Sequence, residues 1–249
     1  MTPSGIRTLT VGAVLEIIID RPARKNAFTN AMYTQLTQQL EAAATLDSIA
    51  VVLIRGEGGN FSSGNDLKDF LENPPTDFSA PVFGLMTILI TFPKPIICAV
   101  EGFAVGIGTT LLLHADIVYA GASAKFQLPF VNLGLVPEAG SSLLLPQVAG
   151  TKAANELFMF GEIFDSETAM RHGIINHIID DGEVLSFTQK RAQILASKPR
   201  GAMQEAKTLM KQPAQALLLQ QIRIEGDAFV KRLQSPEAVQ AMQAFFNRK

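Results

Sequence analysis

Short apolar runs along this chain alternate with longer segments in which apolar residues recur at about every fourth position. The runs Val14–Asp20 and Ala50–Gly56 are rich in β-branched residues and predict buried strands. Between them, Thr29 is typical of a helix N-cap, and the segment 32–40 carries an apolar stripe at helical spacing. This order of strand, helix and strand predicts a right-handed crossover unit.

The same order returns between residues 95 and 121. The sequence PIICAVEG predicts a strand, GTTLLLHA a helix and DIVYAG a further strand. Before this unit, ENPPTDFSAP is typical of an exposed loop, and VFGLMTILITF predicts an apolar helix that could line a pocket. The first part of the chain is therefore interpreted as an α/β core.

After about Asp181 the pattern becomes mostly helical. Apolar residues recur at helical spacing in 187–196, 202–210 and 214–233, and these segments are separated by Pro199, Pro213 and Pro236. The chain is therefore predicted to consist of an α/β core over residues 1–186 and a helical C-terminal region over residues 187–249.

The composition excludes several classes of protein. The 249 residues are 47% hydrophobic and 18% charged, which is typical of a folded domain with a real core. A net charge of −2 argues against a general nucleic-acid surface, so an anionic ligand has to meet a local cluster of cations. One cysteine and three scattered histidines predict no disulfide and no metal site. No secretory signal or membrane span is predicted, so we expect a cytoplasmic protein.

Two glycine-rich turns are candidates for ligand binding. In GNFSSGNDL, residues 59–67, backbone N–H groups around Gly64 and Asn65 could meet a ligand oxygen, although the segment could equally be a surface loop. In EGFAVGIGTTLLL, residues 101–113, Leu111 replaces the third glycine or alanine of a dinucleotide-binding fingerprint. What remains is a helix start at which the N–H of Ile107 is free to face developing negative charge.

Several charged residues in the sequence each have both a functional and a purely structural interpretation. Arg24, Lys25 and Lys68 could meet phosphates or could be ordinary surface charges. Glu138 lies in LVPEAGSS between apolar segments, where it could be a base or could accept hydrogen bonds in a turn. Glu101, before the second turn, is a weaker candidate for a base.

Together these motifs resemble the crotonase superfamily of enoyl-CoA hydratases and isomerases across nearly the whole chain. The matching segments are RPARKNAF, GNFSSGNDL, KPIICAVEGFAVGIGTTLLLHADIVYA, AKFQLPFVNLGLVPEAGSS and FGEIFDSETAMRHGIIN. The resemblance implies a crotonase-type (ClpP-like) α/β spiral of ββα units with a helical C-terminal region that forms trimers. It also implies acyl-CoA thioester substrates, in which coenzyme A belongs to the substrate and no separate cofactor is needed.

The resemblance assigns roles to individual residues. The oxyanion hole is placed on the backbone N–H groups of Asn65 and Ile107, and no metal is expected. The residues expected around the substrate are Arg24, Lys25, Ala27, Ser63, Gly64, Asn65, Asp66, Leu67, Lys68, Gly106 and Phe130. Phe78–Phe92 is the expected wall for the acyl tail. An apolar wall of Leu128, Phe130 and Leu135 is expected to raise the basicity of Glu138.

Departures from the family pattern predict the reaction. Hydratases in this superfamily use two glutamates, and the corresponding positions here are Thr110 and Phe130. Glu138 stands where peroxisomal-type 3,2-trans-enoyl-CoA isomerases have one catalytic glutamate. We therefore expect a Δ3,Δ2-enoyl-CoA isomerase of fatty-acid degradation. The alternatives are an enoyl-CoA hydratase, another crotonase-type reaction such as hydrolysis or ring chemistry, and a non-catalytic acyl-CoA-binding protein.

A homotrimer or a hexamer is also expected, because the C-terminal helices carry many apolar residues. These are Leu217, Leu218, Leu219, Ile222, Phe229, Leu233, Phe245 and Phe246.

Overall fold

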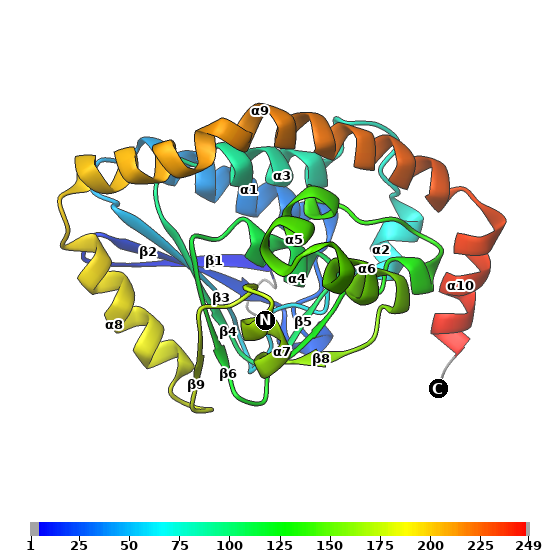
Figure 1. The fold of residues 1–249 in the computed structure, drawn as a ribbon, viewed down its shortest axis with the longest axis horizontal. Helices are drawn as coiled ribbons and strands as arrows, with labels where there is room; N and C mark the ends of the chain where they lie inside the picture. Colours follow the sequence, from blue (N-terminus) through cyan, green and yellow to red (C-terminus); the bar gives the residue numbers. More distant parts are fainter. Residues whose placement is uncertain (1–4, 248–249) are drawn as a thin grey trace.

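A six-stranded sheet in the order β1-β2-β3-β4-β6-β9 lies at the centre of the structure (Figure 1), a computed structural model that describes residues 5–247 and the side chains as far as residue 244. The strands are β1 (Gly5–Val11), β2 (Val14–Asp20), β3 (Val51–Gly56), β4 (Ile96–Val100), β6 (Ile117–Gly121) and β9 (His177–Ile179). β1 and β2 are antiparallel, and the later pairs of this sheet are parallel. The crossover predicted between β2 and β3 is confirmed, with α1 (Asn30–Thr45) as its helix and Thr29 as the N-cap.

The inner strands β2, β3 and β4 are mostly apolar and buried because helices cover both faces of this part of the sheet, whereas the edge strand β1 is largely exposed. The pairing places Ile54 between Ile17 and Cys98, and this row packs against α1 and α3 (Pro81–Thr91). The alternate residues of the strands, such as Leu53 and Ile97, face α8 (Val184–Ala196) in a second cluster.

A small second sheet, β5-β7-β8, was not predicted. Its strands are β5 (Phe103–Val105), β7 (Lys125–Gln127) and β8 (Phe164–Asp165), which are too short to give a periodic signal. The short helical elements around it are η1 (Pro22–Arg24), α2 (Leu67–Glu72), α4 (Ile107–Thr110), η2 (Leu111–Leu113), η3 (Val131–Leu133), α5 (Ser141–Ala149), α6 (Thr151–Phe160) and α7 (Ser166–Arg171).

The helix predicted from GTTLLLHA is shorter than expected. It consists of α4 and the 3-10 turn η2, and the chain leaves helical structure before Asp116. The Asp116 carboxylate accepts a hydrogen bond from Ile96 N–H at 2.8 Å, which ties the start of β6 to β4.

The two helices predicted on either side of Pro213 form one helix, α9 (Arg200–Leu233), which is followed by α10 (Pro236–Asn247). Pro213 is exposed, so water can bind the carbonyl that loses its N–H partner. α9 runs across the top of Figure 1 and packs against α3 and α5. The predicted region boundary at residue 187 falls inside α8. No helix within residues 5–247 has both the length and the apolar character that crossing a membrane requires.

Most of the α9 residues on which the trimer prediction relied do not form a free surface. Leu218, Ile222, Phe229 and Leu233 are buried in the chain's own core, and among those predicted on α9 only Leu217 is largely exposed. That argument was wrong because the stripe packs on α3 and α5. The side chains of Phe245 and Phe246 lie outside the described residues.

Candidate active site

The two glycine turns lie against each other. A parallel bridge joins Ser62 to Ala104, and Val105 N–H donates to Ser62 O at 2.9 Å. Gly64 has a φ of 90°, and a Cβ at this position would lie 2.8 Å from the Val105 carbonyl oxygen. Because glycine has no Cβ and adopts this φ readily, it allows the two turns to approach this closely.

This packing leaves two backbone N–H groups available. Among the described residues, neither Asn65 N–H nor Ile107 N–H has a hydrogen-bond acceptor. Ile107 is the first residue of α4, where N–H groups have no acceptor within the helix. Because the two turns are in contact, these N–H groups form a pair of donors that could stabilise an oxygen with developing negative charge.

A buried tyrosine fixes the position of Asn65. The Tyr33 hydroxyl donates to Asn65 Oδ1 at 2.5 Å, and its ring stacks on Phe28 with 5.1 Å between centroids. Burial first, and Glu138 second, raise the pKa of Tyr33 well above its usual value, so the hydroxyl stays protonated. Sequence reasoning missed this role because Tyr33 adjoins the apolar stripe of α1 and has the pattern of a core residue.

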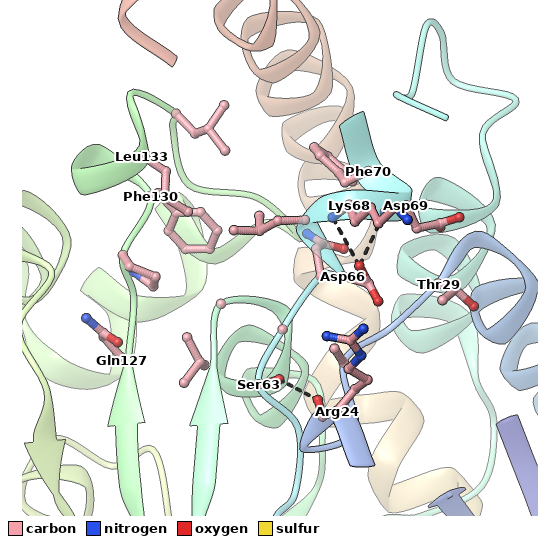
Figure 2. A pocket seen from close by; sticks show the side chains of 18 of the residues that line it. Arg24, Thr29, Ser63, Asp66, Lys68, Asp69, Phe70, Gln127, Phe130 and Leu133 are labelled. Atoms are coloured by element: carbon pink, nitrogen blue, oxygen red, sulfur yellow. Dashed lines mark hydrogen bonds between the residues drawn. The ribbon is translucent and has the colours of Figure 1, made fainter. Parts of the chain in front are cut away.

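A cavity of about 1060 Å³ opens beside the pair of donors (Figure 2). Ten of the eleven residues predicted around the substrate line it: Arg24, Ala27, Ser63, Gly64, Asn65, Asp66, Leu67, Lys68, Gly106 and Phe130. The eleventh, Lys25, is not among the lining residues, and its ammonium lies 4.5 Å from the centre of the Phe103 ring. The structure therefore gathers the predicted residues around one cavity and places Lys25 apart from them.

The large cavity is lined by cations and carboxylates in equal number, and Lys68 Nζ lies 3.8 Å from Glu72 Oε1. Arg24 and Lys68 are exposed, and both line the cavity. Asp66 pairs with Arg21 at 2.7 Å and accepts from the N–H groups of Lys68 and Asp69 at the start of α2 (Figure 2). Its carboxylate is thus occupied in capping α2, and Arg21, which the sequence reasoning missed, fixes it from the other side.

Glu138 lies in a second, much smaller cavity. The residues that line it are Phe70, Pro75, Val82, Phe83, Met86, Glu138, Ala139, Ile222, Glu225, Gly226 and Phe229. Glu138 is 5% exposed, and its Oε1 has no hydrogen-bond partner among the described residues. Burial, and then the carboxylate of Glu225, raise the pKa of Glu138 to about 8. This carboxylate can therefore act as a base of useful strength.

The apolar surroundings of Glu138 differ from those predicted. Phe130 and Leu135 line the large cavity, and Leu128 is packed in the core. The apolar wall beside Glu138 comes from α2, α3 and α9. Three segments far apart in sequence build it, so local sequence could not identify it. The predicted contribution of Phe78–Phe92 is partly visible, since α3 supplies Val82, Phe83 and Met86.

Two aromatic rings lie where the cavities meet. Phe70 on α2 and Phe229 on α9 line both cavities, and their rings form an edge-to-face pair with 5.8 Å between centroids. The pair of N–H donors lies at the large cavity and Glu138 at the small one. A substrate that contacts both has to place its reacting carbons beside these rings.

This chain has no carboxylate at the two positions where hydratases of the superfamily have glutamates. Thr110 is fully buried without a partner for its hydroxyl in the described part of the chain, and Phe130 is apolar. Glu101 lines neither cavity. His114 is a buried structural residue whose Nε2 donates to Ala139 O at 2.6 Å. Within the described residues, no group of three or more His, Cys, Asp and Glu side chains could hold a metal ion.

Comparison with known families identifies this arrangement. Residues 10–249 match the family Enoyl-CoA hydratase/isomerase. The chain belongs to this family. The predicted crotonase resemblance and its fold are thereby confirmed, and acyl-CoA thioesters are the substrates on which the family acts.

Individual members of the enoyl-CoA hydratase/isomerase family that resemble this chain have different activities. The 1,2-epoxyphenylacetyl-CoA isomerase of Escherichia coli is 38% identical over 75% of this chain and 74% of its own length. The 2,3-dehydroadipyl-CoA hydratase of the same organism is 32% identical over 95% and 93%. Human enoyl-CoA delta isomerase 2 is 32% identical over 99% of this chain and 65% of its own length. OdaA of Pseudomonas aeruginosa has a solved structure with a TM-score of 0.95 at 45% identity, covering 98% and 99% of the two chains. Overall similarity therefore does not distinguish isomerase from hydratase activity, and the residues of the site have to decide between them.

Proposed function

We propose that this member of the enoyl-CoA hydratase/isomerase family is a Δ3,Δ2-enoyl-CoA isomerase that moves the C3–C4 double bond of an acyl-CoA thioester to C2–C3. The observation that carries the proposal is the buried carboxylate of Glu138, whose pKa is raised to about 8 and whose Oε1 has no hydrogen-bond partner among the described residues, together with Thr110 and Phe130 at the hydratase positions. Human enoyl-CoA delta isomerase 2 supports it as a relative whose name gives an enoyl-CoA isomerase activity.

One glutamate is sufficient for this reaction. The base removes a proton from C2, and the thioester oxygen gains negative charge as a dienolate forms. The N–H groups of Asn65 and Ile107 stabilise that oxygen, and each such donor is typically worth about 3–4 kcal/mol. Glu138, now protonated, returns its proton to C4 on the same face, so no cofactor and no water molecule are consumed.

Hydration makes different demands. A water molecule has to be oriented for attack on C3 and a proton delivered to C2, which suits two carboxylates. The apolar wall around Glu138 supports the isomerase, because it leaves little room for an attacking water. The ionised form of Glu138 is the base, so kcat/KM should rise as the pH passes through about 8.

Product analysis tests the proposal directly. The protein is incubated with a short panel of 3-enoyl-CoA and 2-enoyl-CoA esters, and the products are separated by chromatography. Interconversion of the 3-enoyl and 2-enoyl esters without 3-hydroxyacyl-CoA is expected. Rapid formation of 3-hydroxyacyl-CoA would establish a hydratase instead. Binding of the esters with no turnover at all would establish a non-catalytic acyl-CoA-binding protein.

A second candidate rests on the similarity to 1,2-epoxyphenylacetyl-CoA isomerase. The rings of Phe70, Phe83 and Phe229 beside Glu138 suit an aromatic acyl group as well as an aliphatic one. Adding a phenylacetyl-derived epoxide thioester to the panel distinguishes isomerisation of a ring from isomerisation of an aliphatic chain.

Arg24 and Lys68, the two exposed cations that line the large cavity, are proposed to bind the phosphates of coenzyme A. The double variant Arg24→Glu/Lys68→Glu should raise KM roughly 5- to 20-fold and leave kcat nearly unchanged, because exposed phosphate contacts are modest and equal in ground and transition states. The difference should shrink at high salt. Lys25→Glu is the matched control, since Lys25 does not line the cavity. A larger rise in KM for Lys25→Glu than for the double variant would place the phosphates elsewhere.

The aromatic pair between the cavities is proposed to limit the acyl group. Phe70→Ala removes one ring from the passage, and the longer esters should then gain in kcat/KM relative to the shortest by about tenfold. The measurement is kcat/KM across a series of 3-enoyl esters. Phe164→Ala, a buried ring that lines neither cavity, is the control for a general loss of packing. An unchanged ratio in Phe70→Ala would show that the acyl chain takes another route.

Assembly and location also belong to the proposal. We expect a homotrimer or a dimer of trimers in the cytoplasm. Exposed apolar side chains that support an interface lie near α5, α6 and α7: Val148, Met159, Phe160, Ile163 and Met170. Others lie on α9: Leu209, Met210, Leu217 and Ile224.

A further inference from the structure

A second carboxylate lies beside Glu138, and sequence reasoning did not identify it. Glu225, on α9, is 5% exposed and lines the same small cavity. It is 87 residues further along the chain, so only the packing of α9 over α3 and α5 brings it there. A buried acid at this place needs a reason.

The hydrogen bonds of Glu225 all lead to the loop that carries Glu138. Its Oε2 accepts from Gly140 N–H at 2.5 Å, and its Oε1 accepts from Ser142 N–H at 2.9 Å. The Ser142 hydroxyl also donates to Oε1 and accepts from Gln221 Nε2 at 2.9 Å. Three donors around one carboxylate favour its ionised form, in opposition to burial, which raises its pKa.

The loop needs this support because its backbone is strained. Ala139 has a φ of 60° and Gly140 a φ of 70°, so two successive residues after Glu138 are left-handed. For alanine this conformation is unfavourable and persists only where neighbouring contacts enforce it. Glu225 holds the N–H of Gly140, and His114 holds the carbonyl of Ala139 from the opposite side.

We infer that Glu225 is a positioning residue for Glu138: it holds the loop 138–142, a strained turn together with the first two residues of α5, so that the Glu138 carboxylate faces the small cavity. The negative charge of Glu225 beside this carboxylate also opposes its ionisation. The inference rests on the proposed role of Glu138 as the base. Glu225 is thereby assigned a structural role and not a role in proton transfer, since all of its hydrogen bonds in the described structure are to the loop.

Of the elements around this pair, α2 contributes Phe70 to the small cavity and carries Lys68, Asp69 and Glu72, which do not line it. α3 and α5, which pack on α9, have no titratable side chain. α1 contributes Tyr33, which stays protonated. His114 is kept neutral because burial lowers its pKa to about 4. Glu225 is thus the group whose charge raises the pKa of Glu138, after burial itself.

The test compares Glu225→Gln with Asp227→Asn. The two changes remove the same charge from α9, but Asp227 is exposed two residues away. In Glu225→Gln at least one loop donor loses its acceptor, and kcat should fall by about 10- to 100-fold with little change in KM. The rising limb of the pH profile should move to lower pH by about half a unit or more, because the neighbouring charge is gone. Asp227→Asn should match the wild type in both respects.

Two further measurements keep the outcome decisive. NMR titration of the glutamate carboxyl carbons, with the Glu138 signal assigned by its loss in Glu138→Gln, reports the Glu138 pKa without any enzymatic assay. If the wild type lacks isomerase activity but Glu225→Gln still lowers this pKa, the inference holds and only the proposed function fails. Ser142→Ala is the substitute test if Glu225→Gln does not fold, because it removes one contact with the loop and keeps the charge of Glu225. It should lower kcat by roughly 3- to 10-fold. An unchanged Glu138 titration in Glu225→Gln, or unchanged kcat in Ser142→Ala, overturns the inference.

Discussion

Glu138→Gln is expected to lower the isomerase kcat by about 10²–10⁴-fold, because one residue moves both protons and the amide cannot accept either. Binding of a saturated acyl-CoA should change little, since the proposed oxyanion donors are backbone groups of Asn65 and Ile107. Steady-state kinetics on a 3-enoyl ester and calorimetric titration with the saturated ester provide the two measurements. Near-wild-type turnover in the variant would move the base away from Glu138.

The stability of the same variant is an internal control. The folded protein keeps Glu138 protonated up to a pH of about 8, whereas the unfolded chain loses this proton near 4.5. A raised folded-state pKa of an acid means that the wild type loses stability as the pH rises between these values. Glu138→Gln has no such loss, so its melting temperature relative to the wild type should increase from pH 5 to pH 8. An inactive variant with this behaviour is folded, and its defect is chemical.

Gly64→Ala is expected to lower kcat by about 10²–10³-fold through the geometry of the oxyanion donors. The new Cβ would lie 2.8 Å from the Val105 carbonyl oxygen, so the two glycine turns have to separate. Separation moves the N–H of Asn65 relative to that of Ile107, and the thioester oxygen no longer reaches both. The loss should appear in kcat more than in KM, because the donors bind the transition state more strongly than the substrate.

Gly59→Ala separates this effect from backbone strain. Gly59 also has a positive φ, of 75°, but a Cβ there would have no atom within 4 Å. It should therefore cost about 1 kcal/mol of stability and leave kcat unchanged. Equal losses of activity in the two variants would mean that backbone strain, rather than the contact with Val105, explains the defect.

The sequence by itself determined the local parts of the site. The glycines at 64 and 106 are needed for backbone positions that other residues rarely adopt, and such requirements are visible in sequence. The strands β2, β3, β4 and β6 were predictable because both faces of the sheet are buried there, which produces short, mostly apolar runs. Glu138 stood out as an acid between apolar segments. These signals are short-range, and a short stretch of sequence contains them completely.

Tertiary structure decided the environment of Glu138 and therefore its chemistry. Phe70, Phe83 and Phe229 come from three helices, and each has the pattern of an ordinary core residue in its own segment. Glu225 lies on a helix whose path through Pro213 the sequence did not predict, and nothing in its neighbourhood along the chain indicates its contact with the loop 138–142. Burial and the approach of a second charge raise the pKa of Glu138, and both depend on how distant segments pack, which local sequence does not encode.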